Sequence, residues 1–324
     1  MTTADLATFG ITTDQLSHAA QLLREGKLVA FPTETVYGLG ANALDANAVE
    51  RIYEAKGRPH SSPIIVHVSN YEMVKRVAAV WPEAAQELAE KFWPGPLTLV
   101  LPKTTAVPGL VTAGLPTVGV RMPAHPVALA LIEAAQVPVA APSANRFTQV
   151  SPTTAAHVEA GLGDRVDYIL DGGPCTVGIE STVLSLAEAT PILYRPGGIS
   201  RRQIEALIGP IAVAQQAANA PAHASPGLHP RHYSPRTHLL LVENGDVPRQ
   251  GSGAYLQLTH FPHHTVGEIV VMPADAAGYA AQLYGVLHEL DARNYDWIAV
   301  ETPPANAEWE AVLDRLRRAA FRTA

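Results

Sequence analysis

Helix-like and strand-like patterns alternate along the first 208 residues of the chain. The first stretch, which Thr13 is expected to cap and Gly26 to end, has apolar residues at helical spacing and precedes an apolar run at 27–31. A second helix is expected to begin at Asp45 and to end near Gly57. Such alternation predicts an α/β or α+β domain with a mixed sheet.

The same patterns give bounds for the other elements. Further helices are expected at 82–92, 127–135, 201–208, 274–290 and 306–319. Strands are expected at 63–68, 97–101, 117–121, 137–141, 168–170, 182–186, 192–195, 239–242, 254–258, 268–272 and 297–300.

A change of composition divides the chain. After residue 210 the sequence becomes rich in Ala, Pro and His without an amphipathic period, which is typical of a linker. We therefore predict a first domain at 1–210, a linker at 211–236 and a small α/β domain at 237–324. A chain of 324 residues with 47% hydrophobic residues can supply two cores.

Charge and cysteine content exclude several classes of protein. A net charge of -7 argues against a surface that grips nucleic acid as a whole. Cys175 is the single cysteine, so no intramolecular disulfide can form. The beginning of the chain lacks the pattern of a secretion signal, and no apolar run approaches the ~20 residues of a membrane-spanning helix. We expect a cytoplasmic protein without membrane contact.

Cations and hydroxyls gather at the ends of the expected strands. Lys56 and Arg58 flank a glycine and could reach one anion together, although cations also suit the end of a helix. Arg121 and Arg195 each end a strand, where open α/β sheets bind ligands, or they form surface ion pairs. With a glycine-rich turn at 171–183, this set indicates a pocket for a nucleoside polyphosphate and a small carboxylate.

Two common types of site do not fit. GLGANA at 38–43 matches the dinucleotide pattern loosely, but six residues separate Phe31 from Gly38, and the chain has no P-loop. His223, His229 and His232 lack carboxylate or cysteine neighbours at a metal-binding spacing, so we interpret them as loop histidines.

A set of motifs in one order gives a resemblance to a known family. They are PTETVYGLG, KGRP followed by SPIIVHV, WPGPLTLVL, VGVRMPAHP, APSAN, DGGP with GIESTV, and YRPGG. Together they resemble the YrdC-like threonylcarbamoyl-adenylate synthases over residues 10–210. The segment SPGLHPRHYSP and the small domain after it look like the two-domain form of that family, although a linker richer in lysine is typical.

The resemblance implies a twisted mixed-sheet YrdC-like domain, a small Rossmann-like second domain and an enzyme. It would condense L-threonine, bicarbonate or CO2 and ATP into threonylcarbamoyladenylate and pyrophosphate, with Mg²⁺ held by the phosphates and no protein metal ligand. The product would pass to a tRNA threonylcarbamoyl transferase, and direct tRNA contact is open. Implied threonine ligands are Thr35, His67, Arg121, Ser181 and the backbone of Ala141; implied ATP ligands are Lys56, Arg58, Ser62, Thr117, Ser143, Asn145, Ser151, Arg195 and the linker residue Tyr233. Lys56 and Arg58 are the expected catalytic cations.

Two rival functions stay open. Similar domains occur in carbamoyltransferases of hydrogenase maturation, but these carry zinc-binding cysteine modules, which a single cysteine does not support. The other rival is a module that binds RNA without catalysis.

Overall fold

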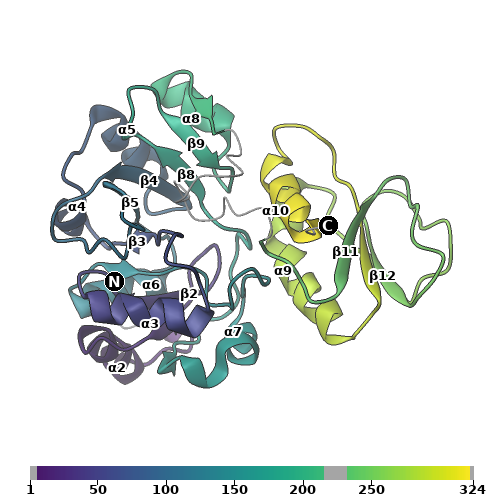
Figure 1. Ribbon diagram of the computed structural model, residues 1–324, viewed down its shortest axis with the longest axis horizontal. Coiled ribbons are helices and arrows are strands. Elements are labelled where there is room, and N and C mark those ends of the chain that lie inside the picture. Colours follow the sequence, from purple (N-terminus) through teal and green to yellow (C-terminus); the bar gives the residue numbers. More distant parts are fainter. Residues whose placement is uncertain (1–5, 215–231, 322–324) are drawn as a thin grey trace.

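The computed structural model describes residues 6–214 and 232–321, which form a large and a small domain (Figure 1). The large domain contains one ten-stranded sheet with parallel and antiparallel pairs, so the expected mixed α/β class is confirmed. Its strands in sheet order are β10 (Ala212–Val213), β9 (Ile192–Arg195), β8 (Thr182–Ser185), β4 (Leu97–Pro102), β5 (Thr117–Arg121), β3 (Val66–His67), β6 (Val139–Ala140), β2 (Gly38–Asn42), β1 (Val29–Phe31) and β7 (Tyr168–Ile169).

The helices of this domain bury one apolar face each. They are α2 (Thr13–Arg24), α3 (Ala46–Lys56), α4 (Tyr71–Val77), α5 (Glu83–Phe92), α6 (Pro126–Ala135), α7 (Ala155–Leu162) and α8 (Arg201–Ile208), with a 3-10 turn η1 (Gly163–Arg165). In α2 the buried residues recur at positions three and four apart, from Leu16 to Leu23, as the sequence pattern predicts. The helix cap is Thr12 rather than Thr13, because the Thr12 hydroxyl and the Gln15 side chain form a capping box.

The small domain is a parallel sheet with two helices on the side that faces the large domain (Figure 1). Its strands in sheet order are β11 (His238–Val242), β14 (Trp297–Glu301), β12 (Gly253–Gln257) and β13 (Glu268–Val271), and its helices are α9 (Ala276–Ala292) and α10 (Glu310–Ala320). Helix α10 starts four residues later than expected, at Glu310 rather than Asn306.

A shared apolar core joins the domains. Ile179 of the large domain and Tyr233 of the linker are buried in one apolar cluster. The same cluster contains Tyr279, Leu283 and Tyr284 of α9. Close backbone approach adds to this contact, since a Cβ added to Gly178 would lie 2.4 Å from the Ala280 carbonyl oxygen. The second domain therefore packs directly against the wall of the first.

Two expected strands are shorter in the structure, and one strand, β2, was not expected. The strand expected at 63–68 shrinks to β3, because Pro63 accepts a hydrogen bond from Arg58 and Ile64 donates to the Val111 carbonyl in a loop. The strand expected at 137–141 shrinks to β6. Strand β2 occupies the GLGAN segment that the sequence suggested only as a loose fingerprint, and it pairs with β1 and β6, which confirms that this segment is not a phosphate loop.

The predicted linker begins with structure. Ala212 and Val213 form β10, which extends the large sheet by pairing with β9. Of the three histidines read from this segment, His223 and His229 lie outside the described residues, whereas His232 is buried. Within the described ranges, none of the helices has the length and apolar character needed to cross a membrane.

Candidate active site

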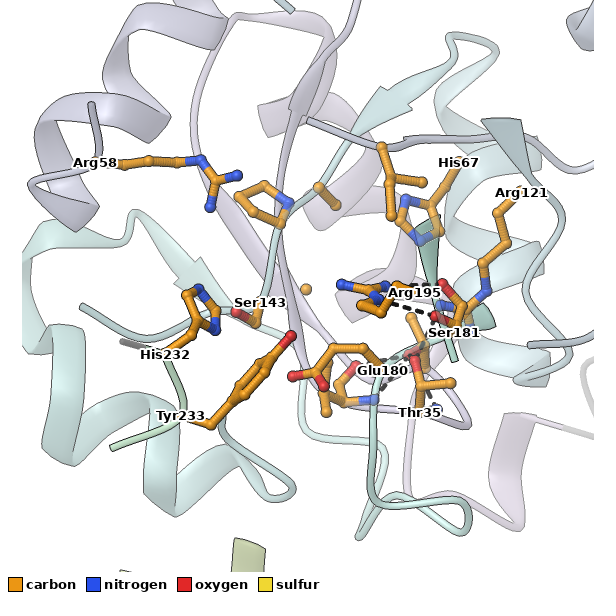
Figure 2. A pocket seen from close by; sticks show the side chains of 16 residues that line it. Thr35, Arg58, His67, Arg121, Ser143, Glu180, Ser181, Arg195, His232 and Tyr233 are labelled. Atoms are coloured by element: carbon orange, nitrogen blue, oxygen red, sulfur yellow. Dashed lines mark hydrogen bonds between the residues drawn. The ribbon is translucent and has the colours of Figure 1, made fainter. Parts of the chain in front are cut away.

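A pocket opens where the strands of the large domain end and the linker returns (Figure 2). Its wall combines cations, hydroxyls, two histidines and one carboxylate from segments far apart in the sequence. The lining residues are Thr33, Thr35, Val36, Gly38, Arg58, Ile65, His67, Arg121, Ala141, Pro142, Ser143, Glu180, Ser181, Arg195, His232 and Tyr233. Nine of the predicted site residues are therefore brought together: Thr35, Arg58, His67, Arg121, Ala141, Ser143, Ser181, Arg195 and Tyr233.

One side of the pocket is built around Arg121. Its position at the end of β5, opposite His67 of β3 in the parallel register, puts both side chains in the pocket wall. Arg121 Nη1 donates to the Thr35 hydroxyl over 3.0 Å, and Nε donates to the Gly95 carbonyl over 3.2 Å. Nη2 lies 2.8 Å from Glu34 Oε1, in an ion pair without hydrogen-bond alignment. These contacts fix the guanidinium before any ligand arrives.

His67 is a neutral group in this wall. Burial, reinforced by the Arg121 charge, lowers the pKa of His67 to about 3. The ring is therefore uncharged at pH 7, and its buried Nδ1 has no aligned partner among the residues described here. An uncharged ring nitrogen beside Arg121 suits a polar ligand group.

Two further cations, Arg58 and Arg195, also line the pocket (Figure 2). Arg58 follows α3 and donates to the carbonyls of Ser62 (3.3 Å) and Pro63 (2.9 Å). Arg195 ends β9 and donates to Ser181 through its carbonyl (3.0 Å) and its hydroxyl (3.2 Å). Burial lowers the pKa of Arg58 to about 10 and also lowers the pKa of Arg195, but arginine stays charged at neutral pH. The pair forms a preorganised cationic wall.

Lys56 stands behind the wall instead of in it. Its Nζ lies 2.5 Å from the carbonyl oxygens of Ser143 and Asn145, and it does not line the pocket. Burial, with the Arg58 charge, lowers its pKa well below the ordinary value. In this structure Lys56 anchors the Ser143 loop, and its predicted contact with an anion shared with Arg58 stays a prediction.

Four other predicted ligands also lie outside this pocket. Asn145 holds the same loop by donating to the Arg146 and Gln149 carbonyls. Ser62 offers its carbonyl to Arg58, and Thr117 lines a smaller neighbouring pocket that shares Ile65 with the first. Ser151 is buried and donates to Glu180 Oε1 over 2.6 Å.

Three titratable residues that line or support the pocket were not predicted: Glu34, Glu180 and His232. Glu34 and Glu180 each stand next to a predicted hydroxyl ligand, Thr35 and Ser181, in the motifs PTET and GIES. The position of each glutamate beside a predicted ligand was the sequence signal that could have identified both as site residues. His232 precedes Tyr233, but its role as a wall residue depends on how the linker folds back.

The pocket does not offer a metal site of its own. The described part of the chain contains no group of three or more His, Cys, Asp or Glu side chains able to hold an ion. The one carboxylate of the wall, Glu180, already accepts hydrogen bonds on both oxygens.

Comparisons with known proteins show the family of the chain. Residues 21–197 match the Sua5/YciO/YrdC family model, described as "Telomere recombination", and residues 199–321 match the C-terminal domain of threonylcarbamoyl-AMP synthase. The chain is 43% identical to the threonylcarbamoyl-AMP synthase of Pyrococcus abyssi (strain GE5 / Orsay), over 93% of this chain and 92% of that protein. It is 44% identical to the protein of the same name from Bacillus subtilis (strain 168), over 94% and 93%.

Solved structures give the same result in three dimensions. The structure of P. abyssi Sua5 complexed with L-threonine superimposes with a TM-score of 0.89 at 41% identity, covering 96% of this chain and 95% of that one. Full-length HypF in the phosphate- and nucleotide-bound form gives a TM-score of 0.50 at 26% identity, covering 56% of this chain and 28% of that one. The likeness to HypF is limited to part of both chains.

Proposed function

The chain belongs to the threonylcarbamoyl-AMP synthase family, and on that premise we propose that it condenses L-threonine, bicarbonate or CO2 and ATP into L-threonylcarbamoyladenylate and pyrophosphate. This is the first step of tRNA threonylcarbamoyladenosine modification. The observation that carries the proposal is the pocket itself, whose wall contains Arg121 with Thr35 and His67 and two further cations, Arg58 and Arg195.

The Arg121 side fits the amino acid. The guanidinium can pair with the threonine carboxylate, since Arg binds planar anions in a fork. The Thr35 hydroxyl and the neutral His67 nitrogen can accept or donate hydrogen bonds to the threonine amine and hydroxyl. The Ala141 backbone and Ser181 complete this side of the wall.

The Arg58 and Arg195 side fits the triphosphate. The reaction joins a carbamate oxygen, formed from the threonine amine and CO2, to the α-phosphorus of ATP, and pyrophosphate leaves with the bond electrons. Negative charge grows on the phosphate oxygens, so fixed cations stabilise the transition state without a covalent nucleophile. Ser143 adds a hydroxyl to this side, and Lys56 and Asn145 hold its loop. Thr117, Ser62 and Ser151 do not line this pocket, and their contact with the nucleotide stays a prediction.

Magnesium enters as part of the substrate. The described residues offer no protein ligand set, whereas triphosphate oxygens are the ligands that Mg²⁺ prefers. We propose that Mg²⁺ arrives with ATP and leaves with pyrophosphate. The product would be consumed by a tRNA threonylcarbamoyl transferase in the cytoplasm, and direct contact of this chain with tRNA stays a prediction.

Pyrophosphate release tests the proposed function. With ATP, Mg²⁺ and bicarbonate present, release is expected only when L-threonine is added, and the adenylate should be detected by mass spectrometry. A non-catalytic RNA-binding module would release none. A carbamoyltransferase-like enzyme, the other alternative, would act on carbamoyl phosphate and would not need threonine.

Tyr233→Ala is expected to weaken ATP binding about tenfold while the fold stays intact. The ring of Tyr233 lines the pocket, stacks on Tyr284 at 5.8 Å and is fully buried, so its loss opens the wall to water. The measurement is an ATP titration by calorimetry, with Tyr71→Ala as the control, because Tyr71 is 39% exposed and does not line the pocket. Unchanged affinity in Tyr233→Ala would remove this residue from the ATP site.

A further inference from the structure

One carboxylate lies in a pocket that otherwise gathers cations for an anionic substrate. Glu180 lines the same wall as Arg195 and is 7% exposed. Burial would raise its pKa, but the charges of Arg315 and Arg195 and the hydrogen bond from Ser151 outweigh burial and hold the pKa below its usual range. The side chain is therefore an anion at neutral pH, next to the place proposed for the triphosphate.

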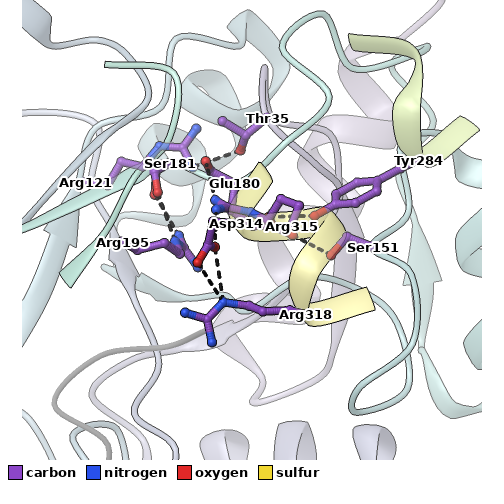
Figure 3. Close-up of polar contacts among 10 residues, drawn as sticks. All are labelled: Thr35, Arg121, Ser151, Glu180, Ser181, Arg195, Tyr284, Asp314, Arg315 and Arg318. Carbon is purple, nitrogen blue, oxygen red and sulfur yellow. Dashed lines mark hydrogen bonds and ion pairs between the residues drawn. The ribbon is translucent and has the colours of Figure 1, made fainter. Parts of the chain in front are cut away.

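The counter-ion of Glu180 comes from the other domain (Figure 3). Arg315 of α10 is completely buried; its Nε lies 2.8 Å from Glu180 Oε2, and its Nη2 donates to the Glu180 carbonyl over 3.3 Å. The guanidinium also lies over the Tyr233 ring, 5.2 Å from its centre. A single side chain of the second domain thus contacts both Glu180 and the linker residue of the pocket.

Two hydroxyls complete the surroundings of the carboxylate. Ser151 donates to Oε1 over 2.6 Å, and Tyr284 of α9 donates to Oε2 over 3.0 Å. Asp314, the neighbour of Arg315, accepts from Arg315 Nη1 (2.8 Å) and from Arg318. The carboxylate is therefore held by both helices that face the large domain.

The charge balance explains why this contact matters for the pocket. A carboxylate without a counter-ion would pair with Arg195 and repel phosphate, and both effects are strong where water is excluded. Its backbone neighbour Ser181 accepts both hydrogen bonds from Arg195, so a shift of Glu180 would also move the arginine. Because Arg315 neutralises Glu180, the charge of Arg195 stays available to the substrate.

We propose that Arg315 is a positioning residue of the active site, through which the second domain neutralises Glu180 and keeps the ATP side of the pocket cationic. This inference rests on the proposed function for the identity of the anion. It gives the second domain a role in catalysis that does not require that domain to touch substrate.

The test replaces Arg315 and Glu180 separately and asks whether each substitution weakens or strengthens MgATP binding. Arg315→Met leaves the Glu180 charge uncompensated, so the dissociation constant of MgATP is expected to rise at least tenfold, with a much smaller change in the threonine KM. Glu180→Gln removes the negative charge, so MgATP is expected to bind two- to fivefold more tightly. Arg317→Gln, an exposed arginine on the same helix, is the matched control.

A purely structural role gives a different result. Both substitutions break the same buried contact, so a structural role predicts that both weaken MgATP binding alike. That outcome overturns the proposal. An unchanged MgATP affinity in Arg315→Met overturns it as well. If Arg315→Met does not fold, Arg315→Lys and Glu180→Gln still test the proposal. Arg315→Lys should keep the MgATP affinity within threefold of wild type. Weaker MgATP binding in Glu180→Gln contradicts the proposal. The wild-type protein separates the two proposals, because absence of threonine-dependent pyrophosphate release refutes the function, whereas wrong signs in an active enzyme refute only the role of Arg315.

Discussion

Replacing Arg58 with alanine is expected to lower threonine-dependent adenylate synthesis by about 10²- to 10³-fold while the protein keeps its fold. The loss corresponds to the removal of one preorganised donor, about 3 to 4 kcal/mol of transition-state stabilisation. Arg58 is 8% exposed, and its Nε and Nη2 are fixed by the carbonyls of Ser62 and Pro63, so the cation is oriented before the triphosphate binds. Truncation removes charge where negative charge grows during the reaction.

The measurement is the initial rate of pyrophosphate release at saturating threonine, with circular dichroism and thermal melting to confirm the fold. Arg165→Ala is the matched control, because this arginine of the same domain is exposed and contacts only the Ala55 carbonyl among the hydrogen bonds observed for it. Full-speed synthesis in a folded Arg58→Ala protein would contradict the cationic-wall mechanism.

Lys56 gives a contrast within the same motif. The sequence pairs it with Arg58, but its ammonium is bound by two backbone carbonyls of the Ser143 loop. Spacing along the chain could place both residues at the end of α3, yet it could not show which carbonyls the lysine would find there. The direction of a long flexible side chain depends on loops that fold over it.

Strand ends were the part of the site that sequence predicted well. Arg121 follows from the local pattern because it ends an expected strand, and His67 follows because it alternates with Val66 and Val68 in another. The parallel pairing of β5 and β3 then brings Arg121 and His67 together. Arg195 follows by the same reasoning at the end of β9. These positions depend on the strands of the sheet. The apolar pattern of each strand is local in the sequence, so the position of its end can be predicted.

The contacts between domains could not be predicted in this way. Glu180 and Arg315 are 135 residues apart, and nothing local to either residue indicates the other. The segment GIES was interpreted as part of a glycine-rich anion nest, whereas the structure shows a carboxylate held by two helices of another domain. The mixed-sheet fold and the cationic pocket thus follow from sequence, but the neutralisation of its one wall carboxylate follows only from the packing of α9 and α10.

Arg121→Met is expected to raise the threonine KM by about 10- to 150-fold and to leave the ATP KM within threefold. The range corresponds to the loss of a charged hydrogen bond of about 1.5 to 3 kcal/mol. Arg121 is 3% exposed and is held by Gly95, Thr35 and Glu34, so it presents a fixed guanidinium to a carboxylate. Methionine replaces the unbranched apolar part of the side chain and removes its charge.

Glu34 complicates this variant, and a second substitution separates the effects. Arg121→Met leaves the buried Glu34 carboxylate without its partner, which typically costs about 3 to 5 kcal/mol of folding stability. The double variant Glu34→Gln with Arg121→Met removes the unpaired charge, so its melting temperature should recover while its threonine KM stays high. If threonine affinity recovers together with stability, Arg121 serves the fold alone. If stability recovers and affinity does not, the arginine binds the substrate carboxylate, because only the missing cation then distinguishes the double variant from an intact pocket.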